Sequence, residues 1–147
     1  MSDESFDLTR FLEAQKLQFK DAIEELRSGC KHSHWIWFVF PQLRELGRSS
    51  TARFYGLENA EEAAAYFRHP TLGSRLRECV EAMLAVEGKS ATEILGDVDA
   101  LKFRSCLTLF LEVAPSDPSL CAALNRFYNG ESDPLTLRLL RASSREA

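Results

Sequence analysis

The stretch Lys31-His-Ser-His-Trp-Ile-Trp-Phe-Val-Phe-Pro-Gln42 decides between helix and strand at the centre of the chain. Its crowded aromatic and β-branched residues would suit a buried strand as well as a buried helix. Pro41 biases the preceding Phe40 toward an extended conformation, so a helix that begins near Ser33 should break there. Because no other stretch offers a partner strand, we interpret the run as a buried aromatic helix with a kink or stop at Pro41.

On both sides of this stretch, apolar side chains recur at helical spacing. The first such pattern follows Asp7 and ends at Ser28-Gly29, which is typical of an amphipathic helix with an N-cap and a glycine stop. Further helices are predicted after Asn59, from Leu72, after Ser90, at Asp97, after Asp117-Pro118 and after Asp133-Pro134.

No stretch alternates strictly between apolar and polar residues, as a half-buried strand would. The patterns therefore predict an all-α fold, a compact multihelical single domain of about seven helices with a kinked aromatic segment. We expect this domain to span residues 7–142, with residues 1–6 and 143–147 as frayed termini.

The composition excludes several classes of protein. The chain has 147 residues, of which 45% are hydrophobic, and a net charge of −4. Such an apolar fraction is unlike that of disordered chains, and no apolar run approaches the ~20 residues of a membrane helix. The acidic start lacks the hydrophobic region of a signal peptide, and the acidic balance argues against a general nucleic-acid coat. We therefore expect a cytoplasmic protein with no membrane partner.

The four cysteines form no CxxC pair, which argues against a zinc or redox site. Three of them stand among apolar residues at helical spacing, so we expect buried free thiols and no disulfide. The four cysteines of the chain are Cys30, Cys79, Cys106 and Cys121.

The charge is distributed unevenly along the chain. Residues 27–53 carry five basic residues against Glu45 alone, whereas the segments before and after them are net acidic. Basic groups beside tryptophan and histidine suit a ligand that is flat and anionic, such as a nucleotide. The alternative is a solvated basic face balanced by acidic helices.

The loop Gly47-Arg48-Ser49-Ser50-Thr51 precedes a short predicted helix. Free N–H groups at a helix N-terminus attract anions, and serine hydroxyls can add donors. The other interpretation is that a serine here acts only as an N-cap. The loop lacks the spacing of a Walker motif.

Two sets of polar residues stand beside apolar stripes. Gln15 falls on the apolar face of the first helix, where its amide would bind the Pro41 segment or a ligand, because an unpaired buried amide costs about 1–3 kcal/mol. Farther along, four polar residues at helical spacing form either a solvent edge or one wall of a cleft. They are Lys102, Ser105, Thr108 and Glu112.

The histidines do not form a metal-binding pattern. His32 and His34 would diverge on a helix, and only His69 remains as a third imidazole. We predict no metal and no cofactor. His34 could serve as a general acid or base, or as a hydrogen-bonding group in a pocket, although a structural role is the simpler interpretation.

Several motifs together resemble the family known as Domain of Unknown Function 1810. The block from Ser33-His34-Trp35 to Pro41-Gln42-Leu43, with Leu46-Gly47 and Ser49 after it, carries the resemblance. Three further pieces match: Phe11-x-x-Ala14-Gln15, His69-Pro70-x-Leu72-Gly73-x-Arg75-Leu76 and Leu101-Lys102-x-Arg104-Ser105-x-Leu107-Thr108-Leu109-Phe110. The resemblance implies a mainly helical fold and leaves the activity open. Cys106 stands where this family commonly has a serine after Ser105. Separately, Glu13-Ala14-Gln15-Lys16 is similar to a short piece of the YbiA-like domains, which are associated with ADP-ribose derivatives.

Two functions of different classes follow as hypotheses. The first is binding or hydrolysis of a small anionic, nucleotide-like metabolite, of ADP-ribose type for example. In it His34 donates a proton or a hydrogen bond, Trp35 or Trp37 stacks on the ligand, and Arg44, Arg48, Ser49 and Ser50 contact the anion. Gln15, Gln42, Tyr55, Lys102 and Ser105 would fix the orientation. The alternative is a non-enzymatic protein–protein interaction module whose middle segment is simply core.

Overall fold

The computed structural model describes residues 6–146, where the regular secondary structure consists of helices joined by loops. Its α-helices are α1 (Thr9–Ser28), α2 (Ile36–Val39), α3 (Ser50–Phe54), α4 (Ala60–Arg68), α5 (Pro70–Ala85), α6 (Ala91–Leu95), α7 (Asp97–Val113), α8 (Pro118–Tyr128) and α9 (Pro134–Glu146), and a 3-10 helix, η2 (Arg44–Leu46), lies between α2 and α3. The all-α prediction is confirmed. The two short helices α2 and α3, both expected in the central segment, bring the described α-helices beyond about seven.

The aromatic stretch folds as predicted into a short helix that stops before Pro41. α2 has only 4 residues and ends at Val39, and the φ of −124° and ψ of 71° at its C-cap, Phe40, leave the helical region. The main chain of α2 is tied to α1, since Gln15 Nε2 donates to the Phe38 carbonyl oxygen at 2.6 Å. The strand alternative is excluded for this stretch.

After Pro41 the chain forms a loop, residues 43–57, which contains η2 and α3. Its two ends meet at an isolated parallel bridge between Leu43 and Leu57, where Arg44 N donates to Leu57 O at 2.8 Å and Leu57 N donates to Gln42 O at 2.9 Å. The contact requires glycine at position 56, because a Cβ there would lie 2.3 Å from Arg44 Cα. This closure fixes the position of Gln42 and of the loop that follows it.

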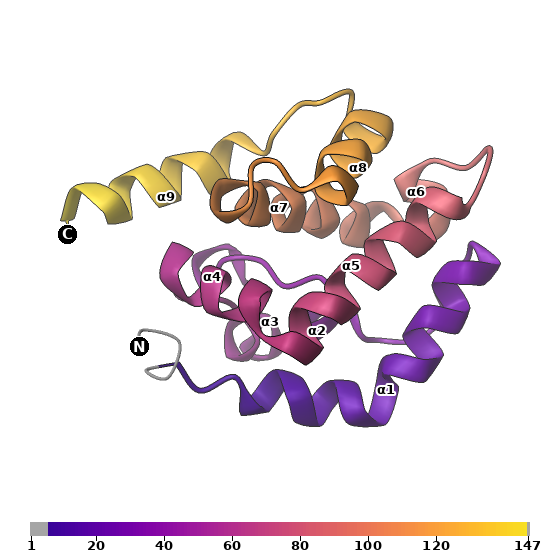
Figure 1. Cartoon of the computed structure of the whole chain (residues 1–147), viewed down its shortest axis with the longest axis horizontal. Helices are drawn as coiled ribbons and strands as arrows, with labels where there is room; N and C mark the ends of the chain where they lie inside the picture. Colours follow the sequence, from indigo (N-terminus) through magenta and orange to yellow (C-terminus); the bar gives the residue numbers. More distant parts are fainter. Residues whose placement is uncertain (1–5, 147) are drawn as a thin grey trace.

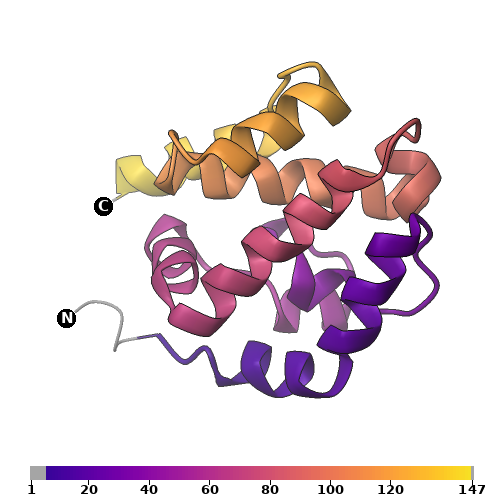
Figure 2. The same cartoon turned by 45° about the vertical axis from the view of Figure 1, so that its right-hand side comes forward.

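Two layers of helices enclose one core. Figures 1 and 2 show α7, α8 and α9 above α1 to α4, with α5 running obliquely between the layers. α5 packs against α1, α4 and α8, and α7 packs against α4, α6, α8 and α9. The buried hydrophobic side chains form one cluster, with Tyr66, Phe103 and Phe110 among its largest members. Both ends of the described chain lie at the same end of the molecule (Figure 1).

Most helix termini follow the capping signals in the sequence. Asn59 caps α4, Ser90 and Glu93 form a capping box on α6, and Asp117 caps α8. The helix expected from Leu72 instead begins at Pro70, where His69 Nδ1 accepts from Thr71 N at 3.1 Å, and it ends at Ala85, before Gly88.

The domain bounds of 7–142 and the frayed termini stay predictions. α9 continues to Glu146, through most of the tail that was expected to be frayed. Residues 1–5 and 147 lie outside the described residues.

The four cysteines differ in burial. Cys79 and Cys106 are buried as predicted, whereas Cys30 is exposed and Cys121 is partly exposed. Cys30 follows the α1 stop, where the chain turns at the surface, so the expectation of buried thiols holds for Cys79 and Cys106 only. Burial raises the pKa of both the Cys79 and the Cys106 thiol.

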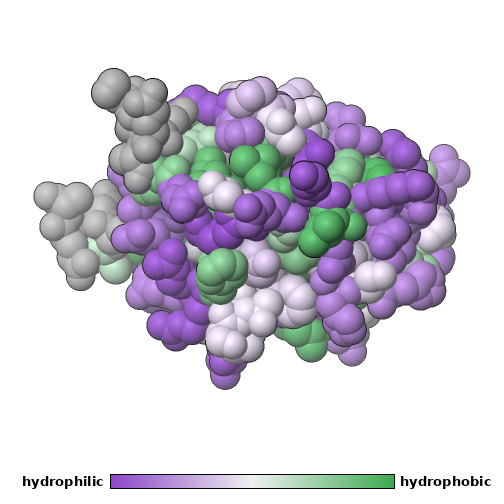
Figure 3. Space-filling view, turned by 90° about the horizontal axis from the view of Figure 1, so that it is seen from below, coloured by the Kyte–Doolittle hydropathy of each residue, from purple (hydrophilic) through white to green (hydrophobic). Residues whose placement is uncertain are grey.

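Polar and charged side chains cover most of the face seen in Figure 3, with smaller apolar areas between them. This mixture is ordinary for a folded domain surface. Across residues 6–146, no helix combines the length and the apolar character needed to cross a bilayer.

Candidate functional site

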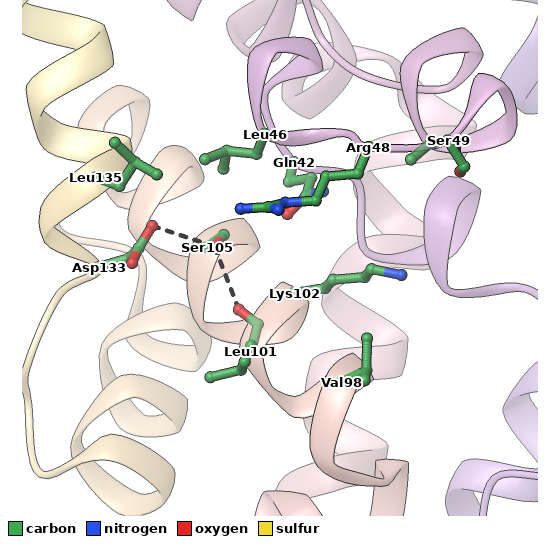
Figure 4. Close-up of a pocket in the computed structure, with 11 residues that line it drawn as sticks. Gln42, Leu46, Arg48, Ser49, Val98, Leu101, Lys102, Ser105, Asp133 and Leu135 are labelled. Atoms are coloured by element: carbon green, nitrogen blue, oxygen red, sulfur yellow. Dashed lines mark hydrogen bonds between the residues drawn. The ribbon is translucent and has the colours of Figure 1, made fainter.

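A cavity of about 450 Å³ lies where the loop between η2 and α3 faces α7 and the start of α9. Its walls combine cationic, neutral polar, acidic and apolar side chains, shown in Figure 4. The lining residues are Gln42, Leu46, Arg48, Ser49, Ala52, Val98, Leu101, Lys102, Ser105, Asp133 and Leu135. Its volume falls within the range of small-molecule sites, which is roughly 300–1,000 Å³.

One wall of the cavity belongs to residues 43–57, whose ends are paired by the Leu43–Leu57 bridge. Ser49 Oγ accepts a hydrogen bond from Ala52 N at 3.1 Å and thereby caps α3. Its hydroxyl is thus an N-cap, as one of the two interpretations held, and it also lines the cavity. The neighbouring Arg48 is exposed, and its guanidinium extends across the cavity in Figure 4. No hydrogen bond or ion pair joins Arg48 to any other residue of the described chain.

The opposite wall is one face of α7. Val98, Leu101, Lys102 and Ser105 all line the cavity, and their positions follow the i, i+3, i+4, i+7 spacing of a single helix face. Lys102 was expected on a polar stripe beside the core, and this stripe does border a cleft at Lys102 and Ser105. Thr108 is buried instead, where its hydroxyl donates to Arg104 O at 2.8 Å.

Lys102 is held at the cavity by two contacts. Its Nζ lies 3.7 Å from Asp99 Oδ1 and 5.5 Å from the centre of the Trp37 ring. Asp99 in turn pairs with Lys31 at 2.8 Å, so a chain of charges connects the loop after α1 with α7. The side chain of Lys102 is mostly buried, at 24% exposed, and its amino group is thus pre-positioned.

Asp133 forms the end of the cavity nearest α9. Its Oδ2 accepts hydrogen bonds from Ser105 Oγ at 3.2 Å, from Thr136 N at 3.1 Å and from the Thr136 hydroxyl. Its own backbone N–H donates to Thr108 Oγ1 at 2.9 Å. These bonds cap α9 and fasten its first turn to α7.

Three apolar side chains that line the cavity are largely exposed to solvent. Val98 is 64% exposed, Leu101 67% and Leu135 45%. Val98 and Leu101 share their helical spacing with the buried Cys106 and Leu109, a pattern that predicts a core face, but the structure exposes both. Hydrogen bonds at the start of α9 join Asp133 to Ser105 and Thr108, one and two turns beyond the exposed Leu101 of α7.

Two residues proposed for ligand contact belong to the core instead. Trp35 is 0% exposed, and its indole Nε1 donates to Glu25 at 2.9 Å. Gln15 is 2% exposed, and its amide bonds Phe38 O and the Tyr66 hydroxyl while accepting from Arg75 at 3.4 Å. The structure therefore corrects their place in the site: neither reaches the cavity, and Gln15 binds the Pro41 segment.

His34 and Trp37 lie beside the cavity rather than in its wall. His34 is exposed and Trp37 is half-buried, with ring centres 6.4 Å apart and planes inclined by 17°. Lys102 connects this pair to the cavity through its contact with the Trp37 ring. Within residues 6–146, no cluster of three or more histidine, cysteine or acidic side chains could hold a metal ion.

Three further residues from the sequence prediction do not line the cavity. Arg44 is half-buried, with its Nε enclosed and unpaired among the described residues. Ser50 is exposed at the start of α3. Tyr55 packs its ring against Phe38 at 5.1 Å and also against Phe11, on the α1 side of the molecule.

Sequence reasoning did not identify several of the lining residues. They are Leu46, Ala52, Val98, Leu101, Asp133 and Leu135. A signal for two of them was present, since Val98 and Leu101 share the helical spacing of Lys102 and Ser105. Asp133 gave only the signal of an N-cap before proline.

Comparison with known proteins gives a family and one close structural relative. The family described as "Protein of unknown function (DUF1810)" matches residues 5–140. The crystal structure of the conserved hypothetical protein Rv1873 from Mycobacterium tuberculosis is similar to this fold, with a TM-score of 0.91 and 45% sequence identity. The similarity covers 93% of this chain and 98% of that one. No functionally curated protein matched the chain.

Proposed function

The chain belongs to the DUF1810 family of proteins of unknown function, and from the geometry of its cavity we propose that it binds a small anionic, nucleotide-like metabolite there. The observation that carries this proposal is that Arg48 and Lys102, from distant parts of the sequence, line one cavity. Cationic groups beside a partly apolar wall suit a ligand that has an anionic end and a flat end.

Arg48 is the main anion contact in this proposal. Its guanidinium is fully available, since no described residue pairs with it, and its planar fork of donors matches a phosphate or carboxylate. Lys102 adds a second positive charge, which Asp99 only partly neutralises at 3.7 Å. Gln42, Ser49 and Ser105 supply neutral hydrogen-bonding groups around them.

The flat part of the ligand would lie against Val98 and Leu101, whose exposed side chains gain from being covered. Trp37 extends this surface past Lys102. Binding is favoured over hydrolysis, because His34, the expected acid or base, lies outside the cavity wall.

A thermal-shift screen with matched arginine variants tests the proposal. The panel contains AMP, ADP-ribose and ribose 5-phosphate, and a ligand at 100 times its Kd should add about 2.7 kcal/mol of stability to the native protein. That increment corresponds to a rise in Tm of several degrees. Arg48→Gln should abolish the rise, whereas Arg53→Gln, an exposed arginine on α3 outside the cavity, should retain it.

A flat response of the wild type to the whole panel would overturn the proposal. An equal rise in wild type and Arg48→Gln would contradict the assignment of the anion contact.

The alternative function is a protein–protein interaction module, and the exposed Val98, Leu101 and Leu135 favour it as a second candidate. Exposed apolar groups that cluster at one site are typical of interaction surfaces. A photo-reactive amino acid at position 101 should then form one defined protein adduct in cells. The adduct should disappear when Leu135→Asp is introduced, and the metabolite panel should give no shift.

A further inference from the structure

We infer that the ligand of this cavity carries hydroxyl groups as well as an anionic group, and that Asp133 selects for those hydroxyls. The inference rests on the proposed function and narrows its ligand class to hydroxyl-bearing phosphate esters, such as a nucleotide with a free ribose. Opposite charges, Arg48 and Asp133, line this cavity without pairing with each other.

Asp133 retains hydrogen-bonding capacity after it has capped α9. The three donors that reach its carboxylate, Ser105 Oγ, Thr136 N and the Thr136 hydroxyl, all bind Oδ2. In the described part of the chain, Oδ1 has no hydrogen-bond partner. A carboxylate oxygen accepts hydrogen bonds readily, and an ionised acceptor makes stronger bonds than a neutral one.

Arg48 faces the same space without neutralising Asp133. Figure 4 shows its guanidinium extended over Ser105 toward the Asp133 end, while Lys102 points the other way. No ion pair joins Arg48 to Asp133 within residues 6–146. The cavity therefore presents a free cation and a carboxylate to one ligand.

This arrangement determines which ligand groups fit. A ligand with only anionic groups would be attracted by Arg48 and repelled by Asp133. A ligand with hydroxyls at its other end can donate to the carboxylate while its phosphate binds Arg48. The Ser105 hydroxyl lies between the two charges and the Gln42 amide lies beside the Arg48 side chain, and both suit neutral hydroxyl groups (Figure 4).

The test compares AMP with 2′,3′-dideoxy-AMP by isothermal titration calorimetry on wild type and Asp133→Asn. Asparagine is as good an N-cap as aspartate, so the variant keeps the α9 cap while it removes the charge and replaces one acceptor oxygen by an NH2 donor. Wild type should bind AMP about tenfold more tightly than the dideoxy nucleotide, which is the scale of one hydrogen bond to a charged group. In Asp133→Asn the affinity for AMP should fall about tenfold, and the dideoxy nucleotide should bind equally well or better.

Asp117→Asn provides the matched control. Asp117 caps α8 outside the cavity, so the same chemical change there should leave both affinities unaltered. An AMP preference that is identical in wild type and Asp133→Asn, or absent from wild type, would overturn the inference while the proposed function stands. A wild type that binds neither nucleotide nor any other compound of the thermal-shift panel would overturn both.

Discussion

Glu25 shows how single residues hold the central segment in place. Its carboxylate accepts from the backbone N–H groups of His32 and Ser33, from the Ser33 hydroxyl and from the Trp35 indole, at 2.6–2.9 Å. Partial burial raises the pKa of Glu25, but the hydrogen bonds led by Ser33 outweigh it and lower the pKa to about 2. The ionised form therefore fastens the loop before α2 to α1.

A pH dependence of stability follows from this pKa. A carboxyl whose pKa is lower in the folded state stabilises the fold above its unfolded pKa, and the gain is lost as the pH falls toward the folded value. For Glu25 this window runs from its ordinary pKa of 4.5 down to about 2. Glu25→Gln should lower the free energy of unfolding by about 1.5–3 kcal/mol at pH 7 and flatten its pH dependence within the window.

Urea denaturation at several pH values measures both effects. Glu24→Gln, at an exposed neighbouring position, should leave stability and its pH dependence close to those of the wild type. A Glu25→Gln curve parallel to that of the wild type between pH 5 and 2 would contradict this role of the carboxylate.

At the scale of single residues, the sequence predicted which side chains were candidate site residues better than it predicted which way those side chains point. Gln15 stood out as polar on an apolar stripe, and its bond to the aromatic segment was one of two expected outcomes. Which of Trp35 and Trp37 faces the core could not be decided, because their orientation depends on the phase of α2, a helix of 4 residues. So short a helix has no amphipathic period to read.

At the scale of elements, the contact between the end of α4 and the start of α5 leaves no space for a side chain at position 73. A Cβ at Gly73 would lie 2.0 Å from the Phe67 carbonyl oxygen, which is a backbone atom and cannot rotate away. Gly73 therefore allows the start of α5 to approach the end of α4, next to the core around Tyr66.

Gly73→Ala should destabilise the protein by about 1–3 kcal/mol, because the added methyl group forces the two helices apart. Chemical denaturation of the purified variant measures the loss. Ser74→Ala, at an exposed position of the same helix, should change stability by less than about 0.5 kcal/mol. A Gly73→Ala variant as stable as Ser74→Ala would show that the two helices can separate without cost.

The helices themselves were predictable because their signals are local. Caps such as Asn59, Ser90 and Asp117 act within one turn, and the structure uses each of them. The face of α7 was harder to assign. Val98 and Leu101 look like core residues in the sequence, and only the tertiary structure shows that both are exposed.

For the whole molecule, the cavity depends on tertiary arrangement rather than on any motif. Its walls come from the loop before α3, from α7 and from the start of α9. The net-basic middle segment indicated Arg48, and the polar stripe indicated Lys102. Nothing local connected either residue to Asp133, because the distance between these segments is set by how the two layers pack.

The most direct measurement is a crystal structure of the protein grown with saturating AMP. The proposed function predicts density for the phosphate within about 3 Å of the Arg48 guanidinium, with the ribose toward Asp133 and the base against Val98 and Leu101. An empty cavity under these conditions, or a nucleotide bound elsewhere on the surface, would contradict the central claim that Arg48 and Lys102 form one anion-binding site.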